Sequence, residues 1–201
     1  MYPIYYSEED LKTLESFYYS NLESYGETGW ICHEKTSKHV HSDVMIFGTP
    51  GEDYIFASFG MGAKPMISPP ELDASRCELI AMCHVPDDSD TAIILQEIVR
   101  LTKFPFENST WLWAGHTVLP SEEFVGRFGC HAFILIPCLT DKLALNCGNV
   151  SFYALAPLYK DEYDRIVATN GGSFEFIKRY YDEIDEDEIF TINTNRKHIL
   201  I

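Results

Sequence analysis

Near the start of the chain, apolar residues recur at helical spacing. They lie three or four residues apart, which places them on one face of a helix. These residues are Leu11, Leu14, Tyr18, Leu22 and Tyr25. Ser7 precedes three acids that suit the positive end of a helix dipole, and Gly26 is suited to the other end. The pattern predicts an amphipathic N-terminal helix within residues 1–26 that packs against the rest of the protein.

Short runs rich in β-branched and aromatic residues follow, and they predict strands. The runs are 30–33, 43–47 and 54–59. Turn-forming residues at 49–53 make the second and third runs an antiparallel hairpin. A later run, 76–85, is apolar on both alternating faces in its second half, as in a strand that is covered on both sides. We place this strand at the centre of the sheet.

Helix and strand patterns alternate through the second half of the chain. Helices are predicted at 90–103, where Pro105 ends the run, from Pro157 to Asn170, and from a cap at Ser173 onward. Strands are predicted at 110–119, 131–137, 150–156 and 189–201. The whole pattern predicts one α+β (mixed α/β) domain over residues 1–201, with a central, mostly antiparallel or mixed sheet flanked by helices.

The charge of the chain narrows the choice of partners. The 201 residues include 31 acids against 15 lysines and arginines, a formal charge of −16. This charge repels nucleic acid and anionic membranes, and it favours a basic protein as partner. The alternative is that the charge serves solubility alone. The first residues do not resemble an export leader and no apolar run reaches the roughly 20 residues that span a bilayer, so we expect a cytoplasmic protein whose six cysteines are free thiols.

Three histidines, His33, His39 and His41, are candidate metal ligands. A His-x-His pair on a strand points both imidazoles to one face, which suits zinc. The sequence shows no third ligand of matching spacing, however, and Lys35 and Lys38 would repel a dication. We therefore predict a polar loop here, with neither a metal nor a cofactor.

Two further motifs suggest chemistry but lack essential parts. The glycine-containing run 60–64 follows a strand, as a phosphate loop does, but it lacks the Lys-Ser/Thr pair and the following helix. Adjacent Cys-His pairs occur at 83–84 and 130–131, but neighbours on a strand point to opposite faces and cannot form a nucleophile–base dyad. Neither nucleotide binding nor thiol catalysis is predicted.

The stretch 111–117 is the most distinctive in the sequence. On a strand it would place Trp111 and Trp113 on one face, with Gly115 and His116 after them. Paired tryptophans are mostly core residues, but beside a cleft they act as rigid anchors for a partner. Both interpretations remain open from the sequence.

Taken in order, several stretches resemble the suppressor-of-fused domain family. They are Phe59-Gly60-Met61 at a strand end, Arg76-Cys77-Glu78-Leu79 at a strand entry, Gly115-His116-Thr117 after the tryptophans, Pro157 to Glu162 before a helix that ends at Gly171-Gly172, and a late Arg196. The resemblance covers about residues 30–198. It implies a mixed α/β domain with a central sheet flanked by helices.

The resemblance also implies that the protein binds another protein. Animal members of the family hold a transcription-factor peptide by strand addition between two lobes. This chain is much shorter, so we carry over neither that cleft nor that partner. Stand-alone bacterial members look like immunity proteins of toxin systems. We therefore expect a non-catalytic module that neutralises a toxin by binding it, and a basic toxin domain would suit the negative charge.

Four residues are our candidates for contact with the partner: Arg76, Glu78, Trp113 and His116. The alternative for the first two is structural, with a buried Arg76 paired to a carboxylate. Two other functions remain open. One is an enzyme with a site near His116, Glu78 and Cys77, and the other is a scaffold or regulatory protein with no toxin partner.

Overall fold

The computed structural model describes residues 3–26, 28–33, 38–72, 75–139, 142–185, 188–189, 191–192 and 196–199. The strands are β1 (Thr28–Cys32), β2 (Asp43–Phe47), β3 (Tyr54–Phe59), β4 (Cys77–Cys83), β5 (Thr117–Val118), β6 (Ala132–Pro137), β7 (Leu143–Leu145) and β8 (Gly148–Leu158). The helices are α1 (Glu8–Leu22), α2 (Asp88–Glu107), α3 (Glu122–Phe128), α4 (Lys160–Ala168) and α5 (Gly172–Glu183), with short 3-10 turns η1 (Glu23–Tyr25), η2 (Met61–Ala63) and η3 (Pro70–Leu72).

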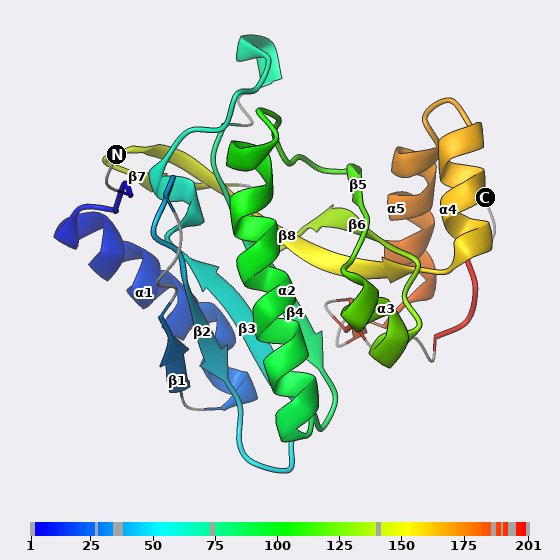
Figure 1. The fold of residues 1–201 in the computed structure, drawn as a ribbon, viewed down its shortest axis with the longest axis horizontal. Coiled ribbons are helices and arrows are strands. Elements are labelled where there is room, and N and C mark those ends of the chain that lie inside the picture. Colours follow the sequence, from blue (N-terminus) through cyan, green and yellow to red (C-terminus); the bar gives the residue numbers. More distant parts are fainter. Residues whose placement is uncertain are drawn as a thin grey trace.

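The strands form one mixed sheet with helices on both faces (Figure 1). Its order is β1-β2-β3-β4-β8-β6-β5, and β7 pairs with β8 beside this path. Side chains of β8 show how the faces are covered. Tyr153 and Leu155 belong to the core under α2, whereas Phe152 packs under α1 and Ala154 packs under α4 and α5. This arrangement confirms the predicted α+β fold with a central sheet.

The two halves of the sheet meet where β4 and β8 run parallel. Their pairing extends from Cys77 and Ser151 to Ile80 and Ala154. Beyond these residues β4 continues beside β3, while β8 continues beside β6. Two described residues near the end of the chain contact one of these strands each. The Ile192 amide donates to a carbonyl of β4 at 2.8 Å, and Arg196 donates to a carbonyl of β8 at 2.6 Å.

Several predicted elements are confirmed. The N-terminal helix is α1, and the Ser7 hydroxyl caps it by accepting from the Asp10 amide at 3.1 Å. β2 and β3 form the expected antiparallel hairpin, and β4 is a wholly buried central strand. Five described cysteines are free, and Cys77, Cys83 and Cys130 among them are buried. None of the described helices is long and apolar enough to cross a membrane.

The prediction of a strand at 110–119 is wrong except for its end. Residues 110–116 form a loop, and the strand is limited to Thr117–Val118. The aromatic residues of this loop pack against the core under α2 as they would on a strand, so their composition does not distinguish the two structures. The two tryptophans therefore do not share a strand face.

Other predicted boundaries are also wrong. Pro105 lies inside α2 because its fixed φ is helical and the helix continues for two more residues. β8 continues to Leu158 through Pro157, so the next helix begins later, at Lys160. α5 begins at Gly172 after the left-handed Gly171, so Ser173 lies in its first turn and is not its cap. Of the predicted strand at 189–201, the described residues show an isolated bridge at Thr191, and residues 190, 193–195 and 200–201 lie outside them.

Candidate functional site

The loop of residues 110–116, which we call the tryptophan loop, borders an open groove of about 550 Å³ between α2 and β5. Phe104, Trp111, Leu112, His116 and Val118 are among the residues that line it. The loop is fixed to β6 by backbone hydrogen bonds, because the Gly115 amide donates to the Leu135 carbonyl at 2.8 Å and the Leu135 amide donates to the His116 carbonyl at 3.0 Å. The wall that the loop forms is therefore fixed by the sheet, and the groove has a mixed lining of aromatic, aliphatic and polar side chains.

His116 lies between the two tryptophans of this loop. Its ring centroid is 5.5 Å from that of Trp111 and 6.4 Å from that of Trp113. Burial lowers the pKa of His116 below its ordinary value, although the hydrogen bond between its Nδ1 and the Trp111 carbonyl opposes this effect. The imidazole is therefore neutral at pH 7 and acts here as an aromatic and hydrogen-bonding group.

Trp111 contributes a polar group with no partner in the described structure. Its indole Nε1–H is buried and lacks an acceptor among the described residues. An unpaired buried donor costs about 1–3 kcal/mol.

Trp113 connects the tryptophan loop to α5. Its ring packs edge-on against Phe174, with 6.3 Å between centroids, and Phe174 is 59% exposed. Gly115 allows this close approach, since its φ is +80° and an added Cβ would lie 3.0 Å from Ser173. We call Trp111, Trp113, His116 and Phe174 the aromatic surface.

Glu78 lies away from the groove. It is fully buried on the face of β4 opposite to Cys77, and four donors surround its carboxyl group. They are the Tyr6 hydroxyl at 3.0 Å, the Ser58 hydroxyl at 2.5 Å, and the Gly60 and Gly62 amides at 3.1 and 2.9 Å. Burial raises the pKa of Glu78 to about 7, against the effect of these hydrogen bonds. The amides that a phosphate loop would offer to an anion are thus bound by this side chain.

Arg76 also stabilises the turn at residues 60–63, whose Gly60 and Gly62 amides bind Glu78. Its guanidinium donates to the carbonyls of Gly62 and Ala63 at 2.6 and 2.7 Å. Its described hydrogen bonds therefore go to carbonyls and not to Glu78. The chain leads from this turn to Met66, whose sulfur accepts from the Leu112 amide at 3.4 Å. Arg76 and Glu78 thus support the segment on which the tryptophan loop rests.

The groups that we considered for catalysis do not form one accessible site. Cys77 is 1% exposed and Glu78 is 0% exposed, so neither presents an atom to a substrate in this structure. Burial also raises the pKa of Cys77 well above its ordinary value, which keeps the thiol protonated. His116 lines the groove, whereas Cys77 and Glu78 are not among its lining residues.

The candidate metal ligands separate into two groups. His39 stacks against Phe106, with 6.4 Å between ring centroids. His33 and His41, in contrast, lie beside Asp43. Our sequence reasoning missed Asp43 because it opens a predicted strand and appeared to be an ordinary strand residue. A prediction that β1 pairs with β2 would have placed Asp43 opposite His33.

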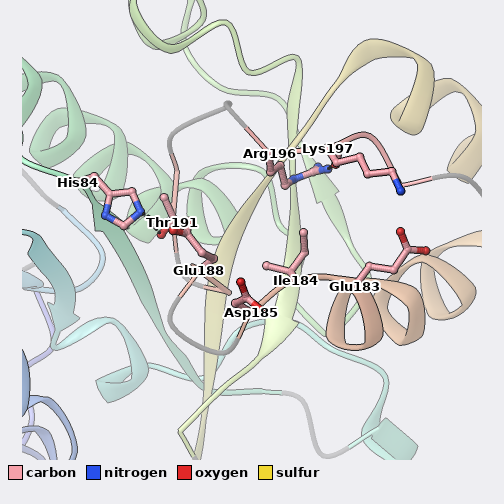
Figure 2. A pocket seen from close by; sticks show the side chains of 8 residues that line it. All are labelled: His84, Glu183, Ile184, Asp185, Glu188, Thr191, Arg196 and Lys197. Atoms are coloured by element: carbon pink, nitrogen blue, oxygen red, sulfur yellow. Dashed lines mark hydrogen bonds and ion pairs between the residues drawn. The ribbon is translucent and has the colours of Figure 1, made fainter.

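A second hollow, of about 380 Å³, lies where β4 and β8 diverge (Figure 2). Its lining residues are His84, Glu183, Ile184, Asp185, Glu188, Thr191, Arg196 and Lys197. Figure 2 shows His84, Thr191 and Glu188 on one side and Arg196 with Lys197 on the other. Arg196 is neutralised by Glu162, to which it donates at 2.6 and 2.7 Å, so the remaining carboxylates leave this hollow negative.

His84 is held at the edge of this hollow by two acids. Its Nδ1 lies 2.8 Å from Asp53 and its Nε2 lies 3.0 Å from Glu188. Partial burial alone would lower the pKa of His84, but these two hydrogen bonds outweigh it and raise the pKa above its ordinary value. The carboxylates of this hollow, Glu183, Asp185 and Glu188, suit a cationic side chain of a partner better than an anion.

Comparisons with known proteins agree with the fold. A solved structure described as a SUFU (suppressor of fused protein) homolog from Neisseria gonorrhoeae FA 1090 is similar over 96% of each chain, with a TM-score of 0.58 and 14% sequence identity. At this identity the likeness shows a shared fold. A comparison with curated proteins gives no match. The model of the family described as suppressor of fused protein (SUFU) matches residues 38–197, most of this chain. The chain belongs to the suppressor of fused family.

Proposed function

We propose that this protein binds another protein through its aromatic surface, without catalysis, and that it acts as an inhibitor of the immunity type against a basic toxin domain. Its family is one of protein-interaction modules, which supports the first part. The observation that carries the proposal is the aromatic surface beside the open groove, in which Trp113 packs on the 59% exposed Phe174.

The aromatic surface has the composition of a binding hot spot. Tryptophan is enriched among the residues that dominate binding energies, because it offers a large rigid area at a small entropic cost. Trp113 and His116 are half-buried, so each has both a fixed position and an accessible edge. We assign these two residues to direct contact with the partner. Arg76 and Glu78 act indirectly, by holding the turn at residues 60–63, which leads to the segment that supports the tryptophan loop.

The charge of the chain supports a basic partner. A formal charge of −16 would steer a positively charged protein toward this one and speed association at low salt. The negative hollow of Figure 2 offers a place for lysine or arginine side chains. A toxin that cleaves nucleic acid has a basic substrate surface, so an acidic inhibitor could cover it.

A pull-down from the native cell, followed by mass spectrometry, tests this function. We expect one basic protein at low salt and less of it at high salt. Trp113→Ala should weaken retention at least about tenfold, the loss of one hot-spot side chain. Ile31→Ala is the matched control, since Ile31 is exposed on β1, at the opposite edge of the sheet from β5.

Other results would favour the alternatives. Equal retention by wild type and Trp113→Ala would show that the aromatic surface is not the binding site. Capture of several housekeeping proteins without a toxin would favour a scaffold. Turnover of a bound small molecule by the purified protein would favour an enzyme.

A further inference from the structure

Three metal-ligating side chains lie together at the edge of the sheet. Nδ1 of His33 lies 3.0 Å from Oδ2 of Asp43, and Nε2 of His41 lies 3.0 Å from Oδ1 of the same carboxylate. All three donor atoms lie within 4.8 Å of one another. We propose that His33, His41 and Asp43 bind one divalent transition-metal ion, for which Zn²⁺ is the best match.

The strand register brings two of these residues together. β1 and β2 are antiparallel, and Cys32 pairs with Val44. The next residue on each side, His33 after β1 and Asp43 at the start of β2, therefore face each other across the pair. His33 lies ten residues before Asp43, so this proximity depends on the hairpin and not on a local motif.

The N-terminal segment fixes the third residue. The His41 amide donates to the Ile4 carbonyl at 3.0 Å, and the His41 ring stacks on Tyr5 with 4.8 Å between centroids. The side chain of Asp43 is 12% exposed, which limits its movement. Two of the three ligands are thus held in place before any ion binds.

The distances require a small adjustment. Bonds of about 2.0–2.1 Å at tetrahedral angles place ligand atoms roughly 3.4 Å apart. The two contacts between imidazole nitrogen and carboxylate are already close to this value. The two nitrogens contact different oxygens of Asp43, so they must move closer to each other and to one shared oxygen. The His33 side chain is 64% exposed and can rotate to do so. The ion would take the place of the protons that now link each imidazole to the carboxylate.

The donor set determines which ions fit. Two imidazoles and one carboxylate suit zinc, copper and nickel, whereas calcium and magnesium prefer oxygen ligands. Three protein ligands leave the fourth zinc position for water or for a group from another molecule. Of the two lysines that weaken the prediction from sequence, Lys38 has an exposed side chain, and Lys35 lies outside the described residues.

Zinc titration of tag-free protein, stripped with a chelator, tests the site. Affinity is measured by competition with a chromophoric zinc indicator, and Co²⁺ in place of Zn²⁺ reports tetrahedral geometry through its visible absorption. The variants are His33→Ala, Asp43→Asn and the matched control His39→Ala, which removes a nearby histidine that is not a ligand. His33→Ala changes an exposed residue after β1, so it should fold as the wild type does.

The expected result is one ion per chain for wild type and His39→Ala, with a tetrahedral Co²⁺ spectrum. His33→Ala and Asp43→Asn should each weaken binding at least about tenfold, because even the loss of a group that only supports a ligand costs about that much. Equal affinity of wild type and His33→Ala, or no binding by wild type, would overturn the proposal. None of these outcomes depends on whether a protein partner is found.

Discussion

The buried carboxyl group of Glu78 should make the stability of this protein depend on pH. The folded state raises the pKa of Glu78 from 4.5 to about 7, because burial penalises the charged form. Between these two values the folded state holds a proton that the unfolded state has released. Stability must therefore fall as pH rises through this window, and level off above it. The size of the effect, at 1.36 kcal/mol for each pKa unit, is about 3 kcal/mol.

Glu78→Gln and Glu78→Ala separate the hydrogen bonds from the charge. Glutamine keeps an acceptor for the Gly60 and Gly62 amides and can donate to the Ser58 hydroxyl, but it does not titrate. Alanine leaves these buried groups and the Tyr6 hydroxyl without their partner, at about 1–3 kcal/mol for each group that stays unpaired. We expect a loss of at least about 3 kcal/mol for alanine and a much smaller loss for glutamine.

Urea unfolding at several pH values between 4.5 and 8, followed by tryptophan fluorescence, measures the effect. The free energy of unfolding of wild type minus that of Glu78→Gln should fall by about 3 kcal/mol across this range. The difference removes the contribution of other groups, including His84, whose raised pKa also favours the folded state at lower pH. Parallel curves for the two proteins would refute the assignment of a raised pKa to Glu78.

Two further predictions concern buried groups. Arg196→Ala should destabilise the protein by about 3–5 kcal/mol, because it leaves the fully buried Glu162 carboxylate without its cation; thermal unfolding checks this, with Lys160→Ala, which breaks an exposed ion pair, as a control of little effect. Cys77 and Cys130 should resist an alkylating reagent at pH 8 until denaturant is added, because burial raises the pKa of both thiols, that of Cys130 to about 12; peptide mass spectrometry would show early modification if the reasoning is wrong.

Elements with a long, regular local pattern could be predicted from the sequence. The helical stripe of α1, the β2–β3 hairpin and the apolar run of β4 depend on neighbours that are near in the chain. The tryptophan loop could not be predicted, because aromatic residues favour burial whether the backbone is extended or looped. Pro105 misled the prediction because its fixed φ is compatible with a helix, so α2 continues past it to Glu107 although one backbone hydrogen bond is lost.

The candidate sites depend on contacts that no local pattern reveals. Glu78 stood out in sequence as a charge in an apolar strand, but its donors include Tyr6, 72 residues away. Asp43 joins two histidines because of strand register. The late Arg196 was a recognisable family feature, and its partner Glu162 lies 34 residues earlier, on a helix. In each case the residue type could be noticed, while its role required the tertiary structure.

The short parallel junction between β4 and β8 has a consequence for how the protein opens. Strands within residues 28–83 form one half of the sheet, and strands within residues 117–158 form the other. Each half is therefore built from one contiguous stretch of the chain. Four residue pairs join the halves. Amide hydrogen exchange should therefore show two groups of amides that open at different free energies, and the amides at this junction should exchange when either group opens.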